Sequence, residues 1–235
     1  MESDEQMLLV VQNDPEVPAG NYGKYLEEFG IEFTLVCPFK GEALPPVEEL
    51  RAVIVLGGAM GVHETATHPF LLDVKRFIRG LVERGVPYLG ICLGGQLLAD
   101  VLGARVVADS GHGEKGSLAV QLTAEGIYDP LFAGIPKEFI TFQWHNDSFD
   151  IPAGGALLAS SPVCPHQAFR YGANAYATQF HPEVDRGIVD SWVRWSEETA
   201  SQATRFLTGF DLSLPQYSAA SRQILANFLH IAGLV

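Results

Sequence analysis

Cysteine is scarce in this sequence: three residues among 235 make an odd, sparse count that does not suit a disulfide framework. Basic residues are few as well, with 15 lysines and arginines against 28 aspartates and glutamates. The resulting net charge of −13 repels phosphate backbones, so we expect no nucleic-acid partner. The cysteine count favours a reducing compartment, and we expect the protein in the cytoplasm.

Long apolar runs are also missing. Gln96 and Asp100 interrupt the best candidate, which therefore falls short of the roughly 18 to 20 residues that span a bilayer. Residues 1–6 are acidic, whereas a secretory signal starts with basic residues. The sequence therefore predicts no membrane association.

What is present is the composition of a globular protein, with 47% hydrophobic and 18% charged residues. Short apolar runs at residues 7–12, 52–56 and 87–91 are typical of strands that are covered on both faces. Residues 70–84 keep apolar side chains at helical spacing, and Gly85 supplies a stop. This strand–helix–strand pattern predicts parallel strands joined by a right-handed crossover.

The pattern of the sequence changes after residue 105. Short β-like runs, separated by glycine and proline, follow at residues 105–108, 118–122, 139–142, 156–160 and 175–180. Helices are predicted over residues 93–102 and over about 186–207 and 218–231, with a loop carrying glycine and proline between the last two.

These elements predict one doubly wound, flavodoxin-like α/β domain over residues 1–235. Its sheet is expected to be mostly parallel, with an added antiparallel region. The motif-bearing core spans about residues 7–185, and the C-terminal helices span about residues 186–235.

A cysteine with small neighbours lies where the strand at residues 87–91 passes into a helix. Gly90 and Gly94 stand two positions either side of Cys92, the spacing that a nucleophile elbow needs, because bulky neighbours would clash in so sharp a turn. The helix N-terminus behind the thiol lowers its pKa and offers N–H groups to an oxyanion. A buried cysteine acting as a small hydrophobe is the alternative interpretation.

A histidine and a glutamate follow the apolar run that begins at residue 175. At this strand end His181 can take the thiol proton, and Glu183 can accept a hydrogen bond from the other ring nitrogen. A glycine pair, Gly57 and Gly58, also follows a strand, where backbone N–H groups can approach a ligand closely. A plain tight turn explains that pair equally well, but the three segments together favour a catalytic site.

These segments resemble the class-I glutamine amidotransferase family, which uses a Cys-His-Glu triad. Residues 90–96 (GICLGGQ) match its nucleophile motif, residues 179–183 (QFHPE) its histidine–glutamate motif, and residues 56–61 (LGGAMG) its oxyanion loop. The resemblance covers about residues 7–185. Within the family, residues 143–150 (QWHNDSFD) are most similar to the glutaminase portion of GMP synthetase and its free-standing relatives.

The resemblance implies that Cys92 attacks the side-chain amide of glutamine and forms a γ-glutamyl thioester. Gly58 and Leu93 would hold the oxyanion with their backbone N–H groups, and His181 would protonate the departing ammonia. Water activated by the same histidine would then release glutamate.

Two further residues are assigned to the substrate pocket by the resemblance. Gln96 matches the family position that binds the glutamine backbone, with a solvent-facing helix residue as the alternative. His145 falls in the family's loop beside the pocket. A non-catalytic packing or hydrogen-bonding role explains this histidine at least as well as a substrate contact does. Ala59 departs from the proline that the family commonly has after its glycine pair, which changes loop stiffness more than donor placement.

No cofactor and no metal are expected. Residues 111–117 (GHGEKGS) match the family loosely and spell a dinucleotide-binding pattern, but the following residues alternate like a strand instead of opening a helix. Cys164 and His166 would make half of a zinc site, and no other Cys/His pair has ligand spacing.

Three hypotheses about function remain open, because the sequence contains no phosphate loop and no length for a synthetase. The first is a glutaminase that feeds ammonia to a separate acceptor enzyme. The second is a free-standing γ-glutamyl hydrolase or peptidase with the same triad, and the third is a catalytically silent regulatory relative, which the intact triad disfavours. Trp192 and Trp195 fall on a predicted amphipathic helix, so core packing is the first interpretation and a homodimer surface the alternative.

Overall fold

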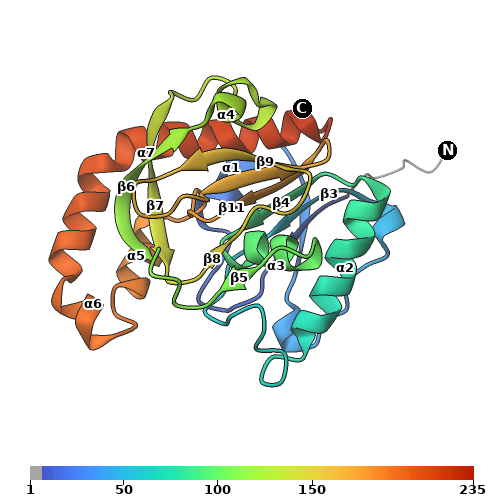
Figure 1. The fold of residues 1–235 in the computed structure, drawn as a ribbon, viewed down its shortest axis with the longest axis horizontal. Helices are drawn as coiled ribbons and strands as arrows, with labels where there is room; N and C mark the ends of the chain where they lie inside the picture. Colours follow the sequence, from blue (N-terminus) through green and yellow to red (C-terminus); the bar gives the residue numbers. More distant parts are fainter. Residues whose placement is uncertain (1–6) are drawn as a thin grey trace.

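The computed structural model describes residues 7–235, so the acidic residues 1–6 lie outside the described residues (Figure 1). Over this range the main sheet has nine strands in the order β2-β1-β3-β4-β11-β10-β9-β6-β7. The parallel strands are β1 (Met7–Val11), β2 (Phe33–Val36), β3 (Leu50–Val55), β4 (Tyr88–Ile91) and β11 (Ala175–Thr178). Their order is the 2-1-3-4-5 order of a flavodoxin-like sheet.

The rest of the sheet is antiparallel. It consists of β10 (Ala168–Tyr171), β9 (Gly155–Ser160), β6 (Glu114–Leu122) and β7 (Glu138–His145). Two short strands, β5 (Val106–Val107) and β8 (Ser148–Phe149), pair separately. The predicted fold class, a doubly wound α/β sheet with an added antiparallel region, is therefore confirmed.

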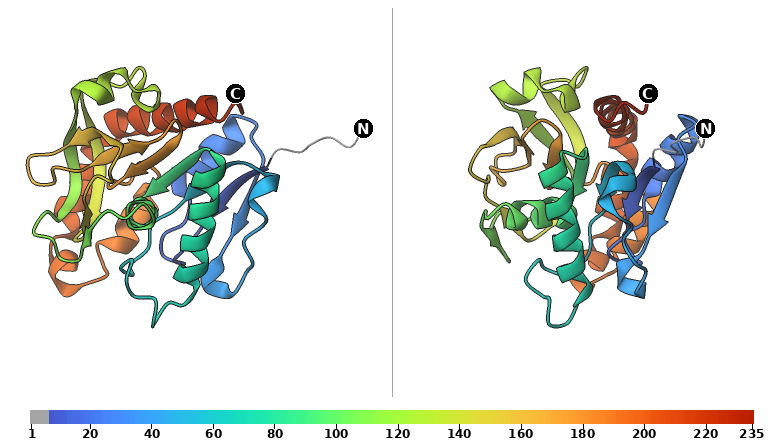
Figure 2. Two further views of the ribbon diagram at one scale, coloured as in Figure 1. Left: turned by 45° about the vertical axis from the view of Figure 1, so that its right-hand side comes forward. Right: turned by 90° about the vertical axis from the view of Figure 1, so that its right-hand side faces the viewer.

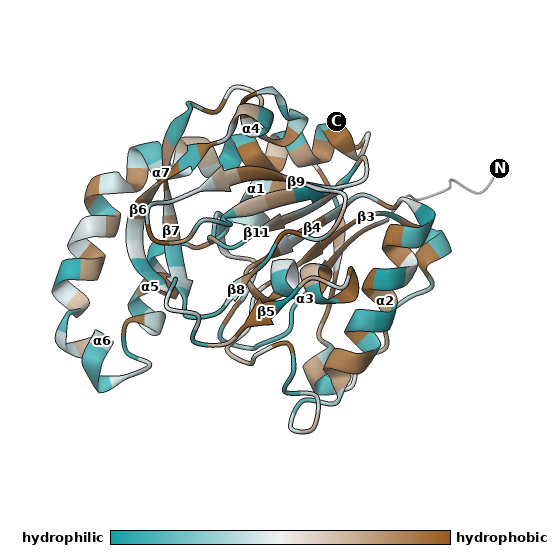
Figure 3. Ribbon diagram, in the orientation of Figure 1, coloured by the Kyte–Doolittle hydropathy of each residue, from teal (hydrophilic) through white to brown (hydrophobic). Residues whose placement is uncertain are grey.

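Helices cover both faces of the parallel strands (Figures 1 and 2). On one face, α1 (Gly20–Glu28) and α7 (Ala203–Ile231) pack over Leu8 and Val10 of β1. On the other, α2 (Phe70–Arg84) and α3 (Leu93–Val101) pack over Leu9 and Val11. Burial on both sides explains why the inner parallel strands are largely apolar, as the brown central strands of Figure 3 show, whereas β2 lies at the edge of the sheet and exposes two side chains.

The C-terminal helices differ from the prediction. Residues 186–207 do not form one helix, because α5 (Arg186–Trp192) ends early and Ser196 starts α6 (Glu197–Ser201) as an N-cap that accepts from the Thr199 N–H. The loop predicted before residue 218 is instead part of the 29-residue α7, with Pro215 inside it. The helix changes direction partway along (Figure 1), as a proline inside a helix commonly causes.

Tertiary packing explains why α7 continues through its weak point. Phe206, Phe210 and Tyr217, on both sides of the proline, are buried in one cluster with Trp192. That burial outweighs the hydrogen bond that the proline removes. No helix among residues 7–235 is both long enough and apolar enough to cross a membrane.

Candidate active site

Cys92 lies at the sharp turn between β4 and α3. Its backbone has φ 50° and ψ −107°, a conformation that non-glycine residues rarely adopt and that stores strain. The Cys92 N–H donates to the Thr178 carbonyl at 2.8 Å, and the Gln96 N–H donates to the Cys92 carbonyl at 2.8 Å. These bonds hold the thiol at the N-terminus of α3, whose dipole favours a negative charge there.

Close packing explains the glycines around the elbow. A Cβ atom on Gly90 would lie 2.5 Å from the carbonyl oxygen of Gly94, and a Cβ atom on Gly94 would overlap the carbonyl oxygen of Val55. The helix behind Cys92 therefore rests directly on the ends of β3 and β4. The predicted strand-to-helix elbow is present in the structure.

His181 and Glu183 form a buried pair just beyond β11. The Nδ1–H group of His181 donates to Oε1 of Glu183 at 2.7 Å, and both side chains are almost fully buried. Burial alone would lower the pKa of His181, but the Glu183 carboxylate and the Cys92 sulfur raise the pKa to about 10. The imidazole therefore holds a proton beside the Cys92 sulfur at neutral pH.

The glycine-rich loop after β3 lies against both reacting side chains. A Cβ atom on Gly57 would lie 3.1 Å from Cε1 of His181 and 3.6 Å from Cβ of Cys92. The three motifs, far apart in the sequence, therefore meet at the carboxyl ends of β3, β4 and β11. This is the edge at which doubly wound sheets place their sites.

Gly58 and Leu93, whose N–H groups the resemblance assigns to an oxyanion, lie close together beside the elbow. Within residues 7–235, the N–H groups of Gly58 and Leu93 form no hydrogen bond, and a Cβ atom on Gly58 would lie 2.8 Å from Cδ2 of Leu93. The loop is held by Asp14, whose Oδ2 accepts from the Ala59 N–H at 2.9 Å. The Asn13 amide donates to the Leu56 carbonyl at 2.8 Å.

A chain of amides leads from the thiol to the pocket. Gln179 donates through Nε2 to the sulfur of Cys92 at 3.6 Å and accepts through Oε1 from Nε2 of Gln96 at 3.3 Å. Gln96 is buried, so the solvent-facing alternative for this residue is wrong. The first residue of the QFHPE motif thus contacts Cys92 directly.

A cavity of about 260 Å³ opens above the elbow. It is lined by Gly58, Ala59, Met60, Cys92, Gln96, Lys115, Trp144, His145, Asn146, Asp147, Trp195, Ser196 and Thr199. His145 lines it from the end of β7, and burial lowers the pKa of this imidazole to about 4, so it is neutral. Lys115 and Asp147 supply the only charged side chains of the lining within the described residues.

Side chains of helix α7 bind the backbone of the segment that carries His181. The Tyr217 hydroxyl group lies 3.2 Å from the His181 carbonyl and 2.9 Å from the Val184 carbonyl, and Ser221 donates to the Pro182 carbonyl. The Trp192 ring, buried as the core-packing interpretation expects, lies edge-on to His181 with 4.7 Å between centroids. Trp195 lies past the end of α5, half-exposed at the cavity.

Sequence reasoning missed several of these residues. Asp14 and Asn13 had a usable signal, because they directly follow the first strand at the edge where sites form. Lys115 and Asp147 lie within residues 111–117 and 143–150, whose likeness to the family is the signal available for them. Tyr217 has none, because only the tertiary arrangement brings it to the site.

Comparisons with known proteins agree with this arrangement. A profile of the family "Glutamine amidotransferase class-I" matches residues 20–191. A glutamine amidotransferase-like protein of Salmonella typhimurium is 32% identical over 79% of this chain and 79% of its own. One subunit of the glutamine-hydrolysing GMP synthase of Archaeoglobus fulgidus is 34% identical over 70% of this chain and 86% of its own.

Longer relatives and solved structures complete the comparison. The chain spans 26% of a GMP synthase from Streptococcus thermophilus, at 38% identity over 58% of this chain. The crystal structure of a glutamine amidotransferase from Thermotoga maritima superposes with a TM-score of 0.86 at 27% identity, covering 97% of this chain and 98% of that one.

Proposed function

Because the chain belongs to the class-I glutamine amidotransferase family, we propose that it hydrolyses the side-chain amide of glutamine on Cys92 and delivers the ammonia to a separate acceptor enzyme. The observation that carries this proposal is the meeting of the strained Cys92, which lines the cavity, with the buried His181–Glu183 pair behind it. A nucleophilic role explains why a cysteine occupies so costly a backbone conformation, whereas a buried structural cysteine does not need it.

The first half of the reaction forms a thioester. The Cys92 thiolate attacks the γ-carbonyl carbon, and the oxygen gains negative charge opposite the N–H groups of Gly58 and Leu93. His181 then gives its proton to the nitrogen as the C–N bond breaks, and ammonia leaves. Glu183 fixes the orientation of the imidazole and stabilises its charged form.

The second half releases glutamate. The imidazole of His181, now neutral, takes a proton from a water molecule, which adds to the thioester carbon. The carbon–sulfur bond breaks, the thiolate of Cys92 returns, and His181 is again protonated. The charge state of the free enzyme is thereby restored.

The cavity suits the amino-acid end of glutamine. Asp147 is the anionic side chain of its lining and Lys115 the cationic one, which matches the ammonium and carboxylate groups of a free amino acid. Gln96 offers a further polar contact from α3. The A. fulgidus relative, named as one subunit of its enzyme, supports a synthetase on a separate chain.

The test combines labelling with kinetics. A glutamine-analogue diazoketone should label Cys92, and Cys92→Ser should lose glutamine hydrolysis by at least about 10⁴-fold, as nucleophile losses do in other triads. Cys37→Ser, a buried cysteine away from the cavity, should keep the wild-type rate. Label on Cys37 or Cys164, or an active Cys92→Ser, would overturn the proposal. Rapid turnover of γ-glutamyl conjugates but not of glutamine would replace it with the γ-glutamyl hydrolase.

A further inference from the structure

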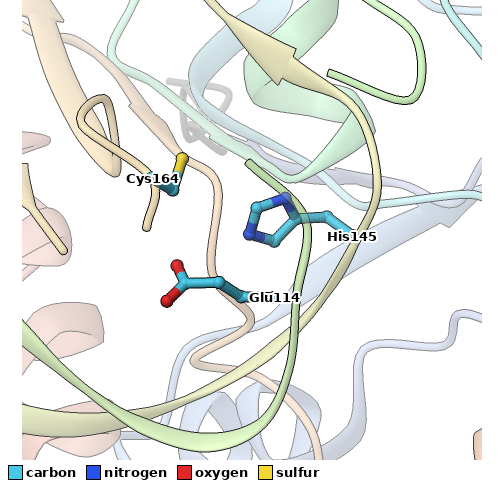
Figure 4. Close-up of side chains that lie close together, drawn as sticks. All are labelled: Glu114, His145 and Cys164. Atoms are coloured by element: carbon cyan, nitrogen blue, oxygen red, sulfur yellow. The ribbon is translucent and has the colours of Figure 1, made fainter. Parts of the chain in front are cut away.

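A second cysteine, histidine and glutamate meet away from the elbow. Glu114 opens β6 and His145 ends β7, and the antiparallel register places the two residues directly opposite each other. Cys164 reaches them from the loop between β9 and β10. One ligand atom of each residue lies within 4.8 Å of the other two (Figure 4), and all three side chains are buried.

The imidazole of His145 is arranged as a ligand. Its Nδ1 lies 3.0 Å from the carbonyl oxygen of Asp147, which can only accept, so Nδ1 carries the proton and Nε2 has a free lone pair. Nε2 is buried and has no hydrogen-bond partner within residues 7–235. Figure 4 shows the ring pointing toward Glu114 and Cys164. A second-sphere carbonyl on the opposite ring nitrogen is the usual arrangement of a metal-bound histidine.

The other two side chains are also held in place. Ser161 donates to Oε2 of Glu114 at 2.7 Å, and Gln167 donates to the same oxygen at 2.5 Å. Ser161 also accepts from the Cys164 N–H at 2.9 Å, which fixes the turn that carries the thiol. The side-chain oxygen of Gln167 is a second buried acceptor without a partner in this part of the described chain.

We propose that Glu114, His145 and Cys164 bind a divalent transition metal of the zinc class. Sulfur, imidazole nitrogen and carboxylate oxygen are the three donor types that zinc takes in proteins. Binding exchanges the Cys164 thiol proton, which leaves to solvent, for the metal. The metal then cancels the charges of the thiolate and the carboxylate, so the buried set is neutral.

The geometry requires a small adjustment. Tetrahedral zinc holds such donors about 3.3 to 3.6 Å apart, given its bond lengths of about 2.0 to 2.3 Å. The present spacing of up to 4.8 Å therefore has to close by about 1 Å, which side-chain rotation can supply. The sequence predicts no metal site, because no Cys/His pair other than Cys164 and His166 has ligand spacing. The three proposed ligands come instead from separate elements, β6, β7 and the loop between β9 and β10.

Cobalt(II) is the probe, because a cobalt–thiolate bond gives a near-ultraviolet charge-transfer band. The full chain, stripped of metal by a chelator and kept reduced, should bind one equivalent of cobalt with this band. Zinc should displace it. Cys164→Ser should abolish the band, whereas Cys37→Ser and Cys92→Ser should keep it.

A second variant distinguishes the loss of a metal ligand from misfolding of the chain. Glu114→Gln keeps the shape of the side chain and removes its charge, and it should weaken cobalt binding at least tenfold while circular dichroism stays unchanged. Zinc should raise the melting temperature of the wild type but not of Cys164→Ser. Absence of the band in the wild type, its loss in Cys92→Ser with retention in Cys164→Ser, or full affinity in Glu114→Gln would each overturn the proposal.

Discussion

His181 keeps its proton because of its neighbours. An imidazole in an unfolded chain titrates near pH 6.5, whereas in the fold burial opposes the charge and Glu183 and Cys92 raise the pKa to about 10. The folded state therefore holds this proton more tightly than the unfolded state does. The stabilisation is fully present below about pH 6.5 and is lost as the pH rises toward 10.

A pH series of urea unfolding should reveal this proton. Between pH 7 and pH 9.5 the free energy of unfolding of the wild type should fall faster than that of His181→Gln, by up to about 1.4 kcal/mol per pH unit. The variant serves as the control for the tyrosines, lysines and cysteines that titrate in both chains. Parallel curves would mean that His181 is neutral in the fold.

At the scale of elements, α7 joins the triad to the core. Tyr217 and Ser221 contact three carbonyls of the segment that carries His181, while neighbouring residues of the same helix pack on the sheet. The helix thus couples the position of His181 to the packing of the whole face.

Removing one hydroxyl group should separate these two roles. Tyr217→Phe leaves the buried His181 carbonyl without its donor, whereas the Val184 carbonyl keeps the bond from the Asn21 amide, so we expect a loss of about 1 to 3 kcal/mol in unfolding free energy. We also expect kcat for glutamine to fall by about tenfold with KM little changed, because a displaced imidazole affects the reaction more than binding. Leu212→Ala, 80% exposed on the same helix, should change neither quantity. A wild-type kcat in Tyr217→Phe would contradict the coupling.

Local signals predicted the parallel strands β1, β3, β4 and β11, because these strands are buried and almost entirely apolar, and they predicted the elbow, because its close packing admits only glycine two positions either side of Cys92. The same signals missed β2 and β10. The first is a short edge strand with exposed side chains, and the second carries Arg170, whose charge is satisfied by Asp129 from elsewhere in the chain. They also misread Pro215 as a helix end, because the buried aromatic residues around it become visible only after folding.

In the candidate site, too, some residues could be predicted from the sequence and others could not. Cys92, His181 and Glu183 could be predicted because each needs a particular residue at a strand end. Gly58, Gln96 and His145, which the resemblance assigns to the site, line the cavity. Lys115 and Trp195 could not be predicted there, because they reach it from β6 and from the turn after α5. Residue type at these positions is not dictated by local backbone geometry.

At the scale of the whole molecule, the proposed glutaminase needs an acceptor enzyme for its ammonia. We predict that the purified protein hydrolyses glutamine slowly and that a partner accelerates it. A glycine-rich loop can turn the Gly58 N–H away from the oxyanion, and one lost donor costs about 10² to 10³ in kcat. Glutamine hydrolysis should be measured with and without fractionated native lysate, with Cys92→Ser as the background control. Fast turnover of glutamine by the protein alone would refute this prediction.

Because α7 follows His181 in the sequence, its contacts with the histidine segment form late during synthesis. The tyrosine that supports His181 lies 36 positions after it, so a growing polypeptide contains the complete triad before it contains the support. Until α7 docks, the segment that carries His181 lacks three of its hydrogen bonds. For the proposed reaction we therefore expect a delay during synthesis, because His181 is held in place only after α7 has folded onto the sheet.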